Sequence, residues 1–191
     1  MFTGLSAFPL TPIHHDAVHE ESFIHLVERL AAARVDSITA LGSTGSYAYL
    51  DTDERRRVAQ LAVAHAAGTP VFVGIGALRT SHVLANATNA ENAGAAGLLL
   101  APMTYQPLTP DDVFELFRAV TTHSSLPVIV YDNPGTTHFT FTPELYGRIA
   151  ALPGIASIKI PAVPADPEHA RERVRSIRAV IPDHVSIGVS G

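Results

Sequence analysis

The sequence predicts a parallel α/β fold, more specifically a (β/α)8 TIM barrel that is incomplete in this chain. Short apolar runs recur about every thirty residues, and several of them are rich in valine and isoleucine, as buried parallel strands tend to be. Segments with helical periodicity lie between these runs. The even alternation favours the barrel, and a doubly wound open sheet is the alternative that periodicity alone leaves open.

Seven of these apolar runs are predicted strands, most of them too short for helices. They are LSAFPL (5–10), DSITAL (36–41), PVFVGI (70–75), GLLLAP (97–102), LPVIVY (126–131), IASIKI (155–160) and HVSIGVS (184–190). About six helices are expected between them.

The segments between the strands carry helix start signals. In LTPDDVFELF, Thr109 is placed to cap a helix, Pro110 takes the first helical position and Asp112 completes a capping box. Thr142 and Pro143 repeat this arrangement in FTPELYGRIA. These two segments are therefore predicted helices.

Helix stops and an apolar stripe complete the pattern. The segments 52–68 and 81–94 end on Gly68 and Gly94, which suit left-handed helix ends. The segment 20–33 places four apolar side chains on one stripe that would cover a sheet: Phe23, Leu26, Val27 and Leu30.

The length of 191 residues favours a single domain over 1–191. The seventh strand is the last element, and no eighth strand or later helices follow it. Barrels of this type run to about 250 residues and seldom fall below about 200. We therefore expect a fragment of a longer product, truncated at the end of strand seven.

Composition excludes several classes of function. The net charge is −5, and the triplet Arg55-Arg56-Arg57 follows acids and is expected on a solvated helix face, so nucleic-acid binding is not expected. The chain has no cysteine, and its ten histidines show no ligand spacing, so no metal site is expected. No signal peptide or membrane span is evident, and we expect a cytoplasmic protein without membrane partners.

Lys159 is the most informative single residue. It is the only lysine of the chain and stands between isoleucines in IASIKI. Burial disfavours an ammonium ion and lowers its pKa from about 10.4, and the neutral amine can then attack a ketone to form an imine. The plainer alternatives are a compositional accident, or a stem that lies along the core with its head in water.

Polar residues follow other predicted strands at the same rim, where barrels carry their catalytic groups. Ser43, Thr44 and Gly45 follow strand two, Tyr105 follows strand four, and Tyr131 ends strand five. The Tyr131 hydroxyl is a candidate for moving protons, and the turn could offer N–H groups and hydroxyls to a carboxylate. Each alone could be a tight turn or a half-buried tyrosine. Together they indicate a site.

At these residues the chain resembles the dihydrodipicolinate synthase and N-acetylneuraminate lyase family of pyruvate-dependent Schiff-base aldolases. The markers occur in order as GLSAFPLTP, GSTGS, PMTYQP, VYDNPGTT and SIKIP. The resemblance covers the whole chain, which would be about the first two thirds of a full member.

The resemblance implies roles for particular residues. Lys159 would form the imine, Tyr131 would relay protons, and Ser43 and Thr44 would bind the carboxylate of pyruvate and complete the relay. Members condense pyruvate with an aldehyde, cleave 2-keto acids or dehydrate sugar acids, without metal or organic cofactor. It also implies small-molecule partners, a keto acid and an aldehyde, and a homo-oligomer (tetramer or dimer) at full length.

Departures from the family pattern bear on the second substrate. Ser46 replaces a usual glutamate, and Met103-Thr104 replaces an aromatic pair, with Tyr105 one place later as a candidate substitute. Thr136 stands where the synthases carry an arginine that anchors the carboxylate of the aldehyde. We therefore expect Tyr105 and Thr136 to contact a substrate other than aspartate semialdehyde, such as a polyhydroxylated keto acid or an uncharacterised aldehyde.

The leading hypothesis is a lyase or aldolase that forms a Schiff base with pyruvate or a related 2-keto acid, similar to 4-hydroxy-tetrahydrodipicolinate synthase. One alternative is a 2-keto-3-deoxy sugar acid aldolase or dehydratase, and another is a catalytically silent ligand-binding member. In a third, the chain is an unrelated barrel or open-sheet protein in which Lys159 pairs with a buried acid, for which Asp132 and Asp36 are the first candidates.

Overall fold

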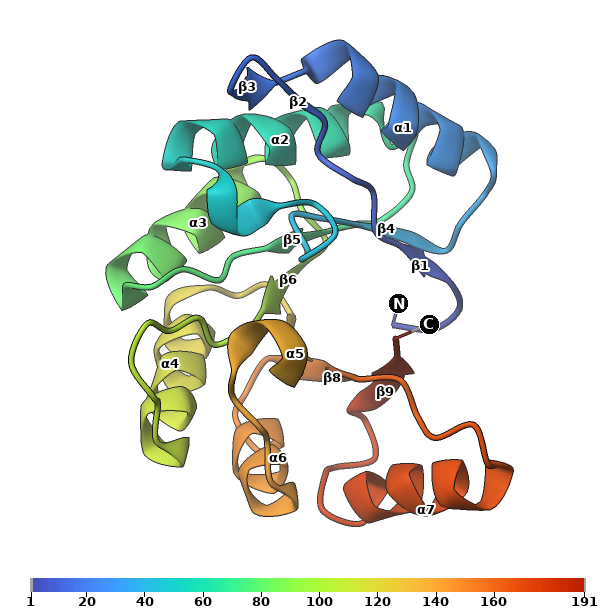
Figure 1. Cartoon of the computed structure of the whole chain (residues 1–191), viewed down its shortest axis with the longest axis vertical. Helices are drawn as coiled ribbons and strands as arrows, with labels where there is room; N and C mark the ends of the chain where they lie inside the picture. The colour runs from blue at the N-terminus through green and yellow to red at the C-terminus, as the bar shows by residue number, and fades with distance from the viewer. Residues whose placement is uncertain (1, 191) are drawn as a thin grey trace. The chain divides into compact units, whose positions relative to one another are not determined.

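Strands and helices alternate along residues 2–190, which the computed structural model describes. Met1 and Gly191, the two ends of the predicted domain, lie outside these residues. The chain forms two compact units, residues 3–99 and residues 100–190 with Phe2. Each is described in turn (Figure 1).

The first unit is built on four parallel strands that pair in chain order. They are β1 (Ser6–Ala7), β4 (Ser37–Ala40), β5 (Val71–Gly74) and β6 (Gly97–Leu100). All residues of β4, β5 and β6 are buried. In a doubly wound sheet the strand order reverses, so that the first strand has neighbours on both sides and the strands do not follow one another in chain order. The sequential order therefore confirms the barrel class over the open sheet.

Three helices connect these strands and pack against one another in sequence. They are α1 (Glu20–Ala32), α2 (Thr52–His65) and α3 (Thr80–Asn92). The predicted stripe of α1 is narrower than expected, because Phe23 and Val27 are fully buried while Leu26 and Leu30 are half-buried. The predicted stops are confirmed, since Gly68 and Gly94 have φ values of +84° and +85°.

Sequence patterns missed a small hairpin before α1. Strands β2 (Ile13–His14) and β3 (Ala17–Val18) pair antiparallel, joined by His15 and Asp16 at φ values of 49° and 62°. Two residues with positive φ are the geometry of a tight hairpin turn. The first parallel strand is correspondingly shorter than the predicted run 5–10.

The second unit contains three parallel strands, again paired in chain order. They are β7 (Val128–Tyr131), β8 (Ile155–Ile160) and β9 (Ser186–Val189). Its helices are α4 (Pro110–His123), α5 (Pro134–Thr137), α6 (Pro143–Ala150) and α7 (Pro167–Arg178). The predicted capping box of α4 is confirmed, because Thr109 and Asp112 exchange side-chain and backbone hydrogen bonds. The Thr142 side chain likewise caps α6.

A register shift separates the two halves of the β7–β8 pair. Val128 is opposite Ile155, but Ile129 is opposite Ser157, so Ala156 is an extra residue in β8. Beyond it, Tyr131 is opposite Lys159. Side chains alternate between faces along a strand, so this shift decides which β7 residues share a face with the lysine.

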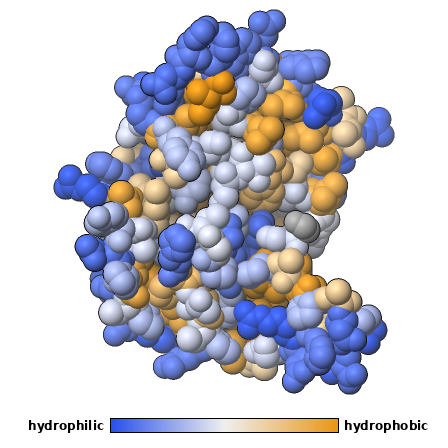
Figure 2. Space-filling model, viewed as in Figure 1, coloured by the Kyte–Doolittle hydropathy of each residue, from blue (hydrophilic) through white to orange (hydrophobic). Residues whose placement is uncertain are grey.

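The last helix of the second unit is mostly polar. Helix α7 buries Ile177 completely, while hydrophilic side chains cover its exposed surface, at the lower right of Figure 2. Among residues 2–190, no helix is both long enough and apolar enough to cross a bilayer.

Candidate active site

Lys159 lies in the middle strand of the second unit. Its neighbours Ile158 and Ile160 are buried, and Lys159 itself is half-buried. Tyr131 of β7 and Gly188 of β9 are its partners across the two strand pairs. The apolar residues that flank Lys159 in the sequence thus form the buried strand β8, which carries the lysine.

Two polar side chains, those of Ser190 and Asn133, lie beside this amine and Tyr131. The amine Nζ lies 4.5 Å from the centre of the Tyr131 ring and donates a hydrogen bond to Ser190 Oγ. The Tyr131 hydroxyl accepts a hydrogen bond of 2.9 Å from Asn133 Nδ2. The structure thus brings Lys159 and Tyr131 together. Ser190 and Asn133 were not among the predicted site residues, although both follow a strand at its carboxyl end.

Burial sets the electrostatics of the lysine. It lowers the pKa of Lys159 from its ordinary value of 10.5, whereas a paired acid would raise it. The two acids considered as partners are engaged elsewhere. Asp132 accepts a hydrogen bond from the Tyr146 hydroxyl, and Asp36 accepts one of 2.7 Å from the Leu5 amide. These observations argue against the ion-pair hypothesis.

The lowered pKa predicts that Lys159 costs stability at neutral pH. The unfolded chain binds this proton more tightly than the fold does, so the cost is absent above pH 10.5 and grows as the pH falls toward the lowered value. We expect Lys159→Met to raise the free energy of unfolding by about 1 kcal/mol at neutral pH. Urea titrations should show the two proteins converging at alkaline pH. An unchanged difference at all pH values would contradict the assignment.

Ser43, Thr44 and Gly45 lie in the first unit, in the turn that follows β4. Gly45 N–H donates to the Gly42 carbonyl at 2.9 Å, and Ser46 N–H donates to the Ser43 carbonyl at 3.1 Å. Ser43 is half-buried and Thr44 is exposed. Ser46 has a φ of 55°, a left-handed conformation that is uncommon outside glycine. The turn is thus locally fixed and presents two hydroxyl residues.

Arg55 is buried beside the residues that flank this turn. The prediction that all three arginines of the triplet lie on a solvated helix face is therefore wrong for Arg55. Only 7% of Arg55 is exposed. Its guanidinium donates to the carbonyls of Gly74 (3.0 Å) and Gly76 (2.9 Å), and lies 5.3 Å from the centre of the Tyr47 ring. Tyr47 begins the short 3-10 helix η1 (Tyr47–Tyr49) directly after the turn. The signal in the sequence was the helical spacing of Arg55 with Val58 and Ala62, which are also buried.

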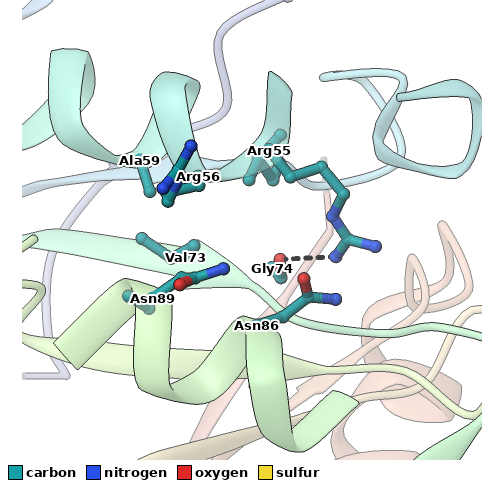
Figure 3. Close-up of a pocket in the computed structure, with 9 residues that line it drawn as sticks. Arg55, Arg56, Ala59, Val73, Gly74, Asn86 and Asn89 are labelled. Carbon is teal, nitrogen blue, oxygen red and sulfur yellow. Dashed lines mark hydrogen bonds between the residues drawn. The ribbon is translucent and has the colours of Figure 1, made fainter. Parts of the chain in front are cut away.

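Figure 3 shows how Arg55 reaches from α2 to the end of β5. A cavity of about 10 Å³ lies here, lined by Arg55, Gly74, Asn86 and other residues. Burial lowers the pKa of Arg55 to about 10, so the group is cationic at neutral pH. A Cβ at Gly74 would lie 1.8 Å from the Leu41 carbonyl oxygen, so only glycine allows this close approach of the two strand ends.

Removing this guanidinium should destabilise the chain. Arg55→Ala leaves two buried carbonyls without their donors and enlarges the cavity, and we expect a loss of about 3 kcal/mol in the free energy of unfolding. The neighbouring Arg56 is the matched control. It is exposed and pairs with Asp53 at 3.0 Å, so Arg56→Ala should cost less than about 1 kcal/mol. Equal losses in urea denaturation would refute the supporting role of Arg55.

The two predicted contacts for a second substrate both lie in the second unit, Tyr105 in the loop after β6 and Thr136 in α5. Tyr105 follows β6 and is 89% exposed, while the preceding Thr104 donates its hydroxyl hydrogen bond to the Gln106 carbonyl. Thr136 is exposed in α5, and its hydroxyl donates to the Asn133 carbonyl at 3.3 Å. Thr136 is therefore hydrogen-bonded to Asn133, the residue that donates a hydrogen bond to the Tyr131 hydroxyl.

Comparisons of the sequence with family models and with curated proteins point to the same family. The model of the dihydrodipicolinate synthetase family matches residues 1–179. The 4-hydroxy-tetrahydrodipicolinate synthase of Hyphomonas neptunium is 38% identical over 160 residues, which are 83% of this chain and 55% of that protein. The synthase of Methylococcus capsulatus is 35% identical over 159 residues, which are 53% of its length. The chain thus spans about half the length of these curated relatives.

Solved structures agree with the sequence matches. A dihydrodipicolinate synthase from Agrobacterium tumefaciens superposes with a TM-score of 0.92 and 47% identity, covering 98% of this chain and 63% of that one. A prophage protein of the dihydrodipicolinic acid synthase family from E. coli K12, solved in complex with pyruvate, superposes with a TM-score of 0.86 and 26% identity, covering 98% of this chain and 64% of that one.

Proposed function

Because the chain belongs to the dihydrodipicolinate synthetase family, we propose that it forms the catalytic part of a Schiff-base lyase or aldolase acting on pyruvate or a related 2-keto acid. One observation carries the proposal. The single lysine of the chain is half-buried, has a lowered pKa, and lies against the ring of Tyr131. A buried amine of this kind is a nucleophile suited to ketones.

The chemistry begins at the amine of Lys159. The neutral nitrogen attacks the keto carbon, and a C–N bond forms while the carbonyl π bond breaks to give an alkoxide. Two proton transfers convert the alkoxide into water, which leaves as the imine forms. Tyr131 is the proposed proton carrier, because its ring lies against the amine and its hydroxyl is oriented by Asn133.

The protonated imine then activates the neighbouring carbon. It withdraws electrons, so a methyl proton can leave to give an enamine, whose carbon can attack an aldehyde. The reverse sequence cleaves a 2-keto acid. In this proposal Ser43, Thr44 and Gly45 bind the carboxylate of the keto acid, and Thr136 and Tyr105 contact the second substrate. These steps need neither a metal nor an organic cofactor.

The second substrate is proposed from the departures at the site. Curated relatives are named as 4-hydroxy-tetrahydrodipicolinate synthases, but Thr136 offers a hydroxyl where a bidentate carboxylate contact would need a guanidinium. A polyhydroxylated 2-keto acid therefore fits better than aspartate semialdehyde. Turnover of aspartate semialdehyde at the rate of a sugar-derived keto acid would refute this preference. A homo-oligomer, dimer or tetramer, is part of the proposal.

Borohydride trapping tests the central step. The chain is incubated with pyruvate, reduced with borohydride and digested, and the masses of the peptides are measured by mass spectrometry. We expect the peptide containing Lys159 to gain the mass of pyruvic acid less one oxygen atom. Lactate, which lacks the keto group, is the control, and proteolysis separates the Met1 amine. Absence of the adduct on Lys159 would refute the proposal. An adduct without turnover of any aldehyde or keto acid would instead indicate the silent ligand-binding member.

A further inference from the structure

Asp132 connects the two residues of the proposed catalytic pair through the backbone. It follows Tyr131 directly, and its N–H donates a hydrogen bond of 3.0 Å to the Lys159 carbonyl. Its side chain is 3% exposed. Any displacement of Asp132 would therefore move the ends of both β7 and β8.

The side chain of Asp132 is fixed on the helix side of these strands. Successive residues of a strand face opposite sides, and Asp132 Oδ2 accepts a hydrogen bond from the Tyr146 hydroxyl of α6. Tyr146 is fully buried and stacks on Phe141, with ring centres 5.4 Å apart and planes 6° from parallel. The cationic side chain of Arg173 in α7 favours the ionised form of the Asp132 carboxyl and so acts to lower its pKa.

A buried acid is expensive unless it has such partners. Burial raises the pKa of Asp132, while Tyr146 and Arg173 oppose that rise. The second oxygen, Oδ1, is buried without a hydrogen-bond partner among the described residues. An apolar residue at this strand end would avoid the cost of burying a carboxyl group. The buried acid therefore points to a role in fixing the positions of the ends of β7 and β8. Networks of this kind rigidify the elements that they join.

We propose that Asp132 is a positioning residue, held by the hydrogen bond from Tyr146, which keeps Tyr131 against the amine of Lys159. The inference rests on the proposed Schiff-base function. It requires that the carboxyl ends of β7 and β8 move together, so that the ring and hydroxyl of Tyr131 keep their place during imine formation. Binding of the keto acid itself does not depend on this cluster.

The test compares rates of pyruvate trapping at Lys159 with pyruvate affinity. Asp132→Ala and Tyr146→Phe should each slow imine formation by about 10-fold to 100-fold, as small misplacements of reacting groups do. The pyruvate concentration at half-saturation should change by less than about threefold. Asp132→Asn should stay within about threefold of wild type, because its amide oxygen can still accept from Tyr146.

Coupling and stability controls separate positioning from simple damage. The double variant Asp132→Ala with Tyr146→Phe should be no slower than Asp132→Ala alone, because both substitutions remove the same hydrogen bond between these two side chains. Ile177→Val is the matched control. It loosens the packing of α7 without touching the carboxylate, so it should lower the melting temperature and leave the rate unchanged. Rates are corrected for the folded fraction of each variant.

The outcomes distinguish the two proposals. If wild type forms no adduct on Lys159, the proposed function and the role of Asp132 are both overturned. If wild type forms the adduct and Asp132→Ala traps pyruvate at the wild-type rate, only the positioning role is overturned. A loss fully accounted for by unfolding, or additive losses in the double variant, would also overturn it.

Discussion

Replacing Lys159 with arginine is expected to abolish pyruvate trapping and to lower any turnover by about 10⁴-fold or more. The guanidinium stays protonated at neutral pH and is no nucleophile, although it retains the charge and much of the length of lysine. Because Lys159 is the only lysine of the chain, loss of the adduct can be assigned to this side chain once proteolysis has separated the Met1 amine. Mass measurement after reduction gives the result directly.

The same reaction in the wild-type chain should depend on pH. Only the neutral amine attacks, and burial lowers the pKa of Lys159 below 10.5, so the rate should rise with pH and reach half its maximum below that value. Arg56→Lys is the control, because it adds a second lysine at an exposed position. If that exposed lysine traps pyruvate as fast as Lys159 at neutral pH, burial gives Lys159 no special reactivity.

Removing the hydroxyl of Tyr131 should give the second largest effect. Tyr131→Phe keeps the ring against the amine but removes the acceptor of the Asn133 hydrogen bond. Loss of a general acid–base group costs about 10²-fold to 10⁴-fold in rate, and we expect this loss in imine formation with Lys159 still the modified residue. Stopped-flow mixing with pyruvate, followed by reduction, measures it.

Tyr49→Phe is the control for that substitution. Tyr49 is 86% exposed in the first unit, so its hydroxyl should have no influence on the rate. Should Tyr131→Phe react as quickly as Tyr49→Phe, the proton carrier would have to be another group, and Ser190, which accepts from the amine, would be the next to replace.

Features that depend on neighbours in sequence were predictable. The capping box of Thr109 and Asp112 and the left-handed stops at Gly68 and Gly94 need only local geometry, and all are confirmed. The placement of Lys159 beside Tyr131 was also predictable, because the carboxyl ends of parallel strands meet at one edge.

Features that depend on distant partners were not predictable. Arg55 and Arg56 are adjacent and chemically identical, yet one is buried on carbonyls of β5 and its loop while the other is exposed. Asp132 was considered as an ion partner of the lysine, but its partner is Tyr146, fourteen positions further on in a helix. A single sequence shows which residue is unusual and does not show which group it meets.

The extra residue Ala156 decides what Lys159 can become. If Ala156 were instead paired with Ile129, Tyr131 would lie opposite Ile158 and Asp132 opposite Lys159. In that unshifted register the amine would share a face with a carboxylate in place of a phenol, and salt-bridge formation would keep it protonated. A register shift of one residue in β8 therefore separates an amine beside a phenol from an internal ion pair.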